Sequence, residues 1–132
     1  MHELDIVSSL LHEREYLENE IVFDEGEEGH AIYIIISGHV QIFRGSGPAR
    51  RQVADLLPGT GFGEMALLTN TPRATQARAG SNSKMLVFFR DDFNNLMHTH
   101  AVIASKLGIN LARHIGLRLR EVLLGRNVVQ TL

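Results

Sequence analysis

Residues 62–79 carry a carboxylate, Glu64, and a guanidinium, Arg73, close behind a run of glycines at 59, 61 and 63. Arg73 carries a fork of donors that matches two oxygens of one phosphate. Glu64, an ionised carboxylate, only accepts hydrogen bonds and suits the hydroxyl groups of a sugar. A phosphate and a sugar close together describe a nucleotide. This combination of residue types therefore predicts a nucleotide-binding site, although each residue taken alone has an ordinary structural explanation.

The segments around these two residues are suited to holding them in place. Glycines at 59, 61 and 63 allow tight turns and a close approach of the backbone to a ligand. Residues 64–68 predict one turn of helix, whose first N–H groups favour an anion. Such a turn is too short to be stable alone, so the loop after it must hold it. Residues 69–72, Thr-Asn-Thr-Pro, predict a turn that delivers Arg73 just before the alternating stretch 74–79.

The run Gly-Glu-Met-Ala-Leu-Leu at 63–68, with Pro-Arg-Ala-Thr at 72–75, closely resembles the phosphate-binding cassette of cyclic-nucleotide-binding domains. The likeness extends from about Arg14 to about Leu119. Such domains occur in regulatory subunits of cAMP-dependent protein kinase, in catabolite-activator-type bacterial regulators and in cyclic-nucleotide-gated channels. The resemblance implies a cyclic-nucleotide sensor and not an enzyme. Its ligand would be cAMP, with cGMP less favoured, and it would need no other cofactor.

The resemblance also assigns roles to single residues. Glu64 would accept the ribose 2′-hydroxyl beside the backbone of Gly63, and Arg73 would pair with the cyclic phosphate. The backbone N–H groups of Ala66 and Ala74 would contact the phosphate oxygens. These residues form the predicted centre of the site.

Further residues are assigned around this centre. Met65 and Val53 would be apolar walls, and Glu27, in the acidic turn 24–29, would orient the arginine. The last helix would cover the base, and Arg118 and Leu119 are the candidate contacts.

The purine preference depends on the two residues after the arginine. Family members that favour cGMP often place Thr or Ser directly after it, whereas this chain has Ala74, which has no side-chain donor or acceptor. We therefore predict a preference for cAMP. Thr75 belongs to the predicted ligand-binding set, but its hydroxyl stands one position earlier than is usual. Strand alternation would point it to the opposite face from Ala74.

Size and composition predict a single cytoplasmic domain spanning residues 1–132. The chain is 44% hydrophobic, has a net charge of -2 and contains no cysteine. It shows no basic surplus for contacting nucleic acid and no apolar run long enough to cross a membrane. Despite 7 histidines, no set at ligand spacing predicts a metal site, and no Ser-His-Asp or paired-carboxylate pattern stands out.

Hydrophobic periodicity predicts a mainly β fold with flanking helices. Short strands with turns between them indicate an antiparallel sandwich or roll, and the resemblance specifies an eight-stranded, jelly-roll-like β-roll. We expect an N-terminal helix within 1–13, the β-roll at 14–90 with the cassette at 62–75, and C-terminal helices at 91–125. The individual predictions are a helix at 5–13 and strands at 15–18, 21–23, 31–36, 39–44, 51–57, 74–79 and 84–89.

Two helices are predicted to end the domain. Asp91 is a good N-cap for a helix at 92–97, and Thr99 for a longer one that reaches about Leu124. The long helix carries one apolar stripe and further leucines beyond it, which suits a lid, an effector contact or a homodimer interface. We expect it to relay ligand occupancy to an effector that the sequence does not identify. The alternative is a nucleotide-free β-roll that acts as a protein-interaction or dimerisation module.

Overall fold

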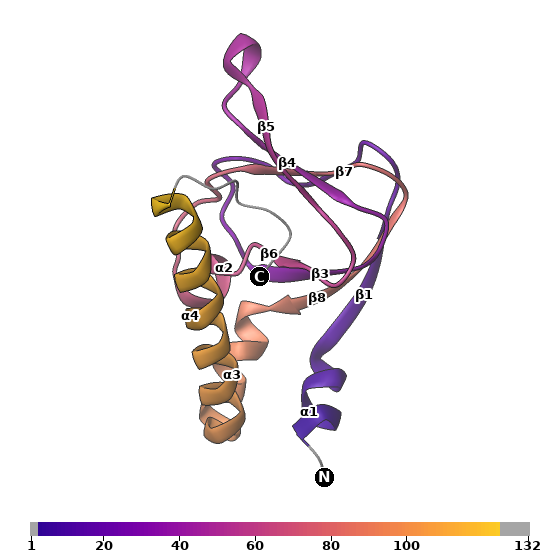
Figure 1. The fold of residues 1–132 in the computed structure, drawn as a ribbon. Helices are drawn as coiled ribbons and strands as arrows, with labels where there is room; N and C mark the ends of the chain where they lie inside the picture. The colour runs from indigo at the N-terminus through magenta and orange to yellow at the C-terminus, as the bar shows by residue number, and fades with distance from the viewer. Residues whose placement is uncertain (1–2, 125–132) are drawn as a thin grey trace.

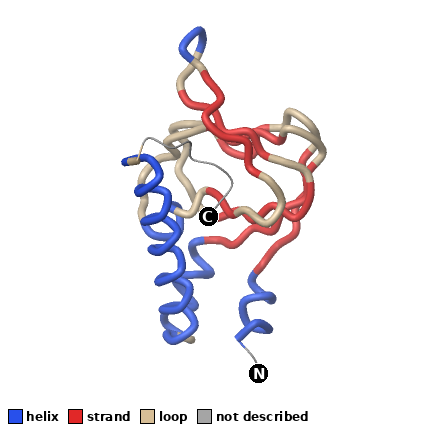
Figure 2. Tube along the Cα trace, viewed as in Figure 1, coloured by secondary structure: helices blue, strands red, loops and turns tan. Residues whose placement is uncertain are grey.

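Two antiparallel four-stranded sheets form a β-roll, and helices flank it at both ends of the chain (Figures 1 and 2). The structure, a computed structural model, describes residues 3–124, except for the side chains of 3–5, 7, 67–68, 111, 114–116, 118–119 and 121–123. The elements are α1 (Glu3–Leu10), β1 (Leu11–Tyr16), β2 (Ile21–Phe23), β3 (Ala31–Ser37), β4 (Val40–Arg44), the 3-10 turn η1 (Gly47–Ala49), β5 (Arg51–Leu56), β6 (Gly61–Phe62), α2 (Met65–Leu68), β7 (Gln76–Ala79), β8 (Ser83–Phe89), α3 (Arg90–Thr99) and α4 (Ala101–Leu123). The strand orders are β1-β8-β3-β6 and β2-β7-β4-β5. The predicted fold class is confirmed.

The main core lies between the two sheets, and every strand except β1 contributes a buried side chain to it. Alternation along each strand directs one side chain in two inward, which explains why β4 buries Val40 and Ile42 but not Gln41. The buried members are Phe23, Ile35, Val40, Ile42, Leu56, Phe62, Ala77 and Met85. This core fixes β6, the short strand that leads into the cassette.

A second apolar cluster attaches the C-terminal helices to the first sheet. Ile32 and Phe88 point outward from β3 and β8, and Phe93 and Leu96 of α3 pack on them. Ile103 of α4 completes the cluster with its neighbour Ala104. Figure 1 shows α4 running beside α3, and α3 in turn contacts α2. The helices are therefore placed next to the cassette.

The structure corrects the predicted bounds at the N-terminal end. The helix α1 stops at Leu10 and does not reach Glu13. Residues from Leu11 to Tyr16 instead pair in continuous register with β8, from Leu11 opposite Phe88 to Tyr16 opposite Ser83. Backbone pairing with a long buried strand outweighs the apolar spacing that predicted a longer helix.

Both predicted helix caps near the C-terminal end are wrong. Phe89 is the N-cap of α3, and Asp91 lies inside the first turn, where its charge complements the helix dipole. The helix begins early because Arg90 N–H donates to His30 O at 2.7 Å. Thr99 is the last residue of α3, where its hydroxyl donates to Asn95 O at 3.0 Å.

Candidate ligand-binding site

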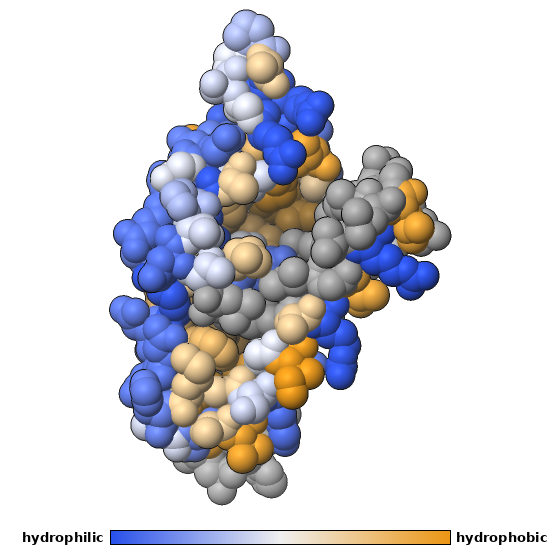
Figure 3. Space-filling model, turned by 90° about the vertical axis from the view of Figure 1, so that its left-hand side faces the viewer, coloured by the Kyte–Doolittle hydropathy of each residue, from blue (hydrophilic) through white to orange (hydrophobic). Residues whose placement is uncertain are grey.

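A cavity of about 740 Å³ opens between the second sheet and the segment that carries α2. On the face in Figure 3, the surface is hollowed below the projecting β4–β5 hairpin, and the floor of the hollow is apolar. Eight of the predicted site residues line this cavity: Val53, Gly63, Glu64, Met65, Ala66, Arg73, Ala74 and Thr75. Residues far apart in sequence are thus brought to one place by β4, β5, β6 and α2.

Gly63 sets the local backbone of the cassette. Its φ of +76° is a conformation that side-chain-bearing residues rarely adopt, and it turns the chain from β6 into α2. Glu64 follows in the N-cap position of α2, and only 5% of its surface is exposed. Ala66 N–H, one of the predicted phosphate donors, here donates to Gly63 O at 3.1 Å. The cassette therefore holds one of its donor groups within its own turn.

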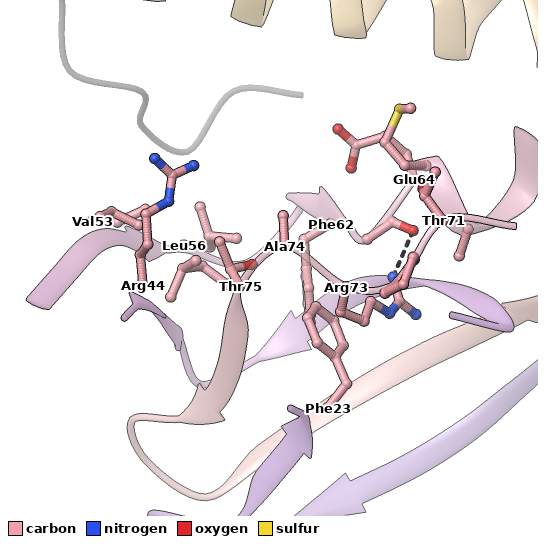
Figure 4. A pocket seen from close by; sticks show the side chains of 16 residues that line it. Phe23, Arg44, Val53, Leu56, Phe62, Glu64, Thr71, Arg73, Ala74 and Thr75 are labelled. Carbon is pink, nitrogen blue, oxygen red and sulfur yellow. Dashed lines mark hydrogen bonds between the residues drawn. The ribbon is translucent and has the colours of Figure 1, made fainter. Parts of the chain in front are cut away.

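The side chain of Arg73 is tied to two backbone carbonyls. Its Nη1 donates to Gly63 O at 2.9 Å (Figure 4), and its Nη2 donates to Ala31 O at 2.8 Å. The guanidinium also lies 4.1 Å from the centre of the Phe23 ring, which is a cation–π distance. Its Nε is buried and has no hydrogen-bond partner among the described residues. The guanidinium is thus held in place by two backbone carbonyls and an aromatic ring.

Burial and the neighbouring side chains shift the pKa of Arg73 in opposite directions. Burial lowers the pKa of the guanidinium below its ordinary value. Tyr33, and after it the carboxylates of Glu27 and Glu64, raise that pKa. The group stays a cation, because an arginine ordinarily loses its proton only far above neutral pH. A partly desolvated cation beside a cavity is suited to an anionic ligand.

The acidic turn 24–29 holds the backbone of Arg73. Gly26 N–H donates to Arg73 O at 2.8 Å, and Arg73 N–H donates to Glu27 O at 2.7 Å. Glu27, predicted to orient the arginine, therefore contacts it through its backbone, while its side chain is exposed outside the cavity lining. Sequence reasoning missed Gly29, whose backbone packs so closely that a Cβ there would lie 2.9 Å from Arg73 Nε. The only sequence signal for this close packing was the presence of a glycine in the acidic turn.

The opposite end of the cavity is mainly apolar. Val53 and Leu56 of β5 line it together with Ile42 of β4. Sequence reasoning missed Arg44, the last residue of β4, which also lines this end (Figure 4). A flat apolar ring fits such a wall, and Arg44 adds a cation at its edge.

The predicted orientation of Thr75 is wrong. Both Ala74 and Thr75 line the cavity, although strand alternation predicted opposite faces. The reason is that both residues form a bend, and β7 begins only at Gln76. The period of two that applies within a strand does not hold there. The hydroxyl of Thr75 therefore lies on the same cavity as the side chain of Ala74.

The two predicted base contacts on the last helix, Arg118 and Leu119, lie on α4, but their side chains are outside the described part of the structure. No described side chain of α4 lines the cavity. Of the described residues, no three His, Asp or Glu are grouped so that they could hold a metal ion. None of the helices within 3–124 is both long and apolar enough to cross a membrane.

The chain matches known proteins over most of its length. Residues 13–100 match the family model described as the cyclic nucleotide-binding domain. The cyclic AMP receptor protein of Thermus thermophilus is 37% identical over 120 residues, which are 90% of this chain and 54% of that protein. The cAMP-dependent protein kinase regulatory subunit of Hypocrea atroviridis is 30% identical over 96 residues, 73% of this chain and 20% of that protein. The crystal structure of the Thermus thermophilus catabolite activator protein has a TM-score of 0.77 and 36% identity, and covers 93% of this chain and 56% of that one. This chain therefore spans about half the length of its Thermus relative and a smaller part of the kinase subunit.

Proposed function

Because this chain belongs to the cyclic nucleotide-binding domain family, we propose that it is a cytoplasmic sensor which binds cAMP and passes its occupancy to the C-terminal helices. The observation that carries the proposal is that Arg73 and Glu64 line one cavity whose other end is apolar. A cation, a carboxylate and an apolar wall match the phosphate, sugar and base of a nucleotide.

The phosphate contact needs a small rearrangement of the cassette. Arg73 Nε, which has no partner among the described residues, and the remaining N–H groups of the guanidinium would make charge-assisted bonds to the cyclic phosphate. Ala66 N–H would leave Gly63 O in the same step, and Ala74 N–H would contact a second oxygen. The ligand thus takes a donor group that the cassette otherwise uses within its own turn. Binding and a change in cassette geometry are therefore linked.

The cassette is connected to the helices by Arg90, the first residue of α3. Its Nη1 donates to Asn70 Oδ1 at 2.6 Å and to Gly29 O at 3.2 Å, and its Nη2 lies 3.8 Å from a carboxylate oxygen of Glu28. One guanidinium therefore joins the segment after α2, the acidic turn beside Arg73 and the start of α3. We propose that cassette movement reaches α4 through this link and shifts the population of two helix arrangements. The effector, or a second copy bound through α4, would respond to that shift.

A thermal-shift titration tests the ligand directly. At a cAMP concentration of about 100 times Kd, binding should stabilise the native state by about 2.7 kcal/mol and raise Tm by several degrees. From Ala74 we expect cGMP to give a smaller rise at equal concentration, and cyclic dinucleotides serve as further comparisons. If no nucleotide changes Tm, the sensor proposal is wrong, and the nucleotide-free interaction module becomes the better explanation. Nucleotide turnover in the same samples would instead indicate an enzyme.

The sugar contact predicts discrimination against 2′-deoxy-cAMP. A hydrogen bond to a charged group contributes about 1.5–3 kcal/mol, so the deoxy ligand should bind at least about tenfold more weakly than cAMP. Calorimetry should show that Glu64→Gln, which keeps the volume of this buried side chain, reduces the difference between the two ligands. Glu15→Gln is the matched control, because Glu15 is exposed on β1 and does not line the cavity. Equal binding of both ligands by the unmodified chain would remove the role of Glu64.

A further inference from the structure

Arg44 lies at the end of the cavity farthest from the phosphate and sugar residues. Figure 4 places it beside Val53, Leu56 and Thr75, whereas Glu64 and Arg73 lie together at the other end. If the phosphate and sugar bind as proposed, the base must lie at the Arg44 end. The inference below therefore rests on the proposed function.

Among the described residues, the guanidinium of Arg44 has no polar partner. None of its donors makes a hydrogen bond or an ion pair with the part of the chain that the structure describes. By contrast, Arg50 lies 4.0 Å over the Phe43 ring and donates to Gln76 Oε1 at 3.1 Å. Arg44 is also directly opposite Arg51 in the β4–β5 register, and like charges in that position repel. A hydrogen-bond acceptor bound at Arg44 would give its donors a partner and would offset the repulsion from Arg51.

The chemistry of a purine edge decides what Arg44 can recognise. An arginine only donates hydrogen bonds. Guanine offers two acceptors side by side, O6 and N7, and a guanidinium fork fits both, whereas adenine offers N7 beside the amino donor N6. The wall around Arg44 is apolar at Val53 and Leu56, so its donors and the hydroxyl of Thr75 are the polar side-chain groups lining this end among the labelled residues of Figure 4.

We propose that Arg44 is a specificity-determining residue which donates to the purine edge: to N7 of either base and, in addition, to O6 of guanine. Ala74 and Arg44 then act in opposite directions. Ala74 withholds a contact from the guanine amino group, and Arg44 supplies one to the guanine carbonyl. The pocket therefore keeps a measurable affinity for cGMP, and Arg44 narrows the preference for cAMP.

Calorimetric titration of cAMP and cGMP into the unmodified chain and Arg44→Ala tests this. We expect the variant to lose about tenfold in cGMP affinity and less than about threefold in cAMP affinity, so that the preference for cAMP rises. Arg44→Lys keeps the charge but not the fork, and should lose most of the cGMP affinity too. With 7-deaza-cGMP, which lacks the N7 acceptor, the unmodified chain should bind more weakly than with cGMP, and Arg44→Ala should respond far less.

Arg51→Ala is the matched control, because Arg51 carries the same charge on the adjacent strand and does not line the cavity. If Arg44→Ala lowers both affinities equally, as the loss of a distant charge would, the proposal is overturned. It is also overturned if the variant changes neither affinity, or if the unmodified chain has no measurable affinity for cGMP. Failure of the proposed function is distinct: the unmodified chain would then bind neither nucleotide.

Discussion

Arg73→Ala should weaken cAMP binding by about ten- to a hundredfold, because the charge-assisted bonds to the cyclic phosphate contribute about 1.5–3 kcal/mol. The loss should be large because Arg73 is the one arginine at the phosphate end of the described cavity lining. Calorimetric titration of both forms measures it. Equal affinities would remove the phosphate role from this residue.

The test must separate binding from folding, because Arg73 also contributes to the stability of the fold. Its bonds to Gly63 O and Ala31 O are lost in Arg73→Ala, so the free energy of unfolding should be measured beside the affinity. Arg78→Ala is a matched control: Arg78 also has a buried Nε with no partner in the described chain, and it does not line the cavity. A variant that melts earlier but keeps its affinity would assign Arg73 a purely structural role.

The strands were predictable from sequence because most of them are locally determined. Ala31–Ser37 and Ser83–Phe89 are apolar runs rich in β-branched and aromatic residues, and both form strands within one residue of the predicted bounds. Gly61–Phe62 was missed as a strand because two residues carry no period. It forms because Tyr33 and Ile34 pair with it from β3, which is a tertiary effect.

The ends of the helices were less predictable, because contacts with distant parts of the chain decide where each helix begins and stops. The preference of Asp91 for an N-cap is a local property, whereas α3 begins where Arg90 N–H reaches a carbonyl of a distant loop. The apolar spacing near Glu13 is compatible with both a helix and a strand, and only the pairing with β8 decides between them. Local patterns therefore gave the element types, and long-range contacts set their limits.

The site residues that belong to one contiguous motif could be predicted from sequence, whereas those from other parts of the chain could not. Gly63, Glu64 and Arg73 belong to one ordered segment, and the structure places all three on one cavity. Arg44 and Gly29 come from other parts of the chain, and no local signal relates them to Arg73 or to the base end. Only the packing of β4 and of the acidic turn against this segment brings them there.

Gly63→Ala should lower both the free energy of unfolding and the affinity for cAMP. The φ of +76° is strained for alanine, and the added Cβ would lie 2.5 Å from Arg73 Nη1. Strain at such a residue costs about 1–3 kcal/mol, and overpacking adds about 1–3 kcal/mol. Urea unfolding should show the combined loss of stability. Calorimetry should show a further fall in cAMP affinity, because the guanidinium must move away from Gly63 O.

Gly59→Ala separates these two effects. Gly59 has a φ of +89°, which strains alanine in the same way, but a Cβ there would meet nothing within 4 Å. It should therefore lower the free energy of unfolding by the strain alone and leave the affinity nearly unchanged. The difference between the two variants measures how tightly the Gly63 backbone confines Arg73. If both lose the same stability and both keep their affinity, the position of Arg73 does not depend on Gly63, and the phosphate site must be held by other contacts.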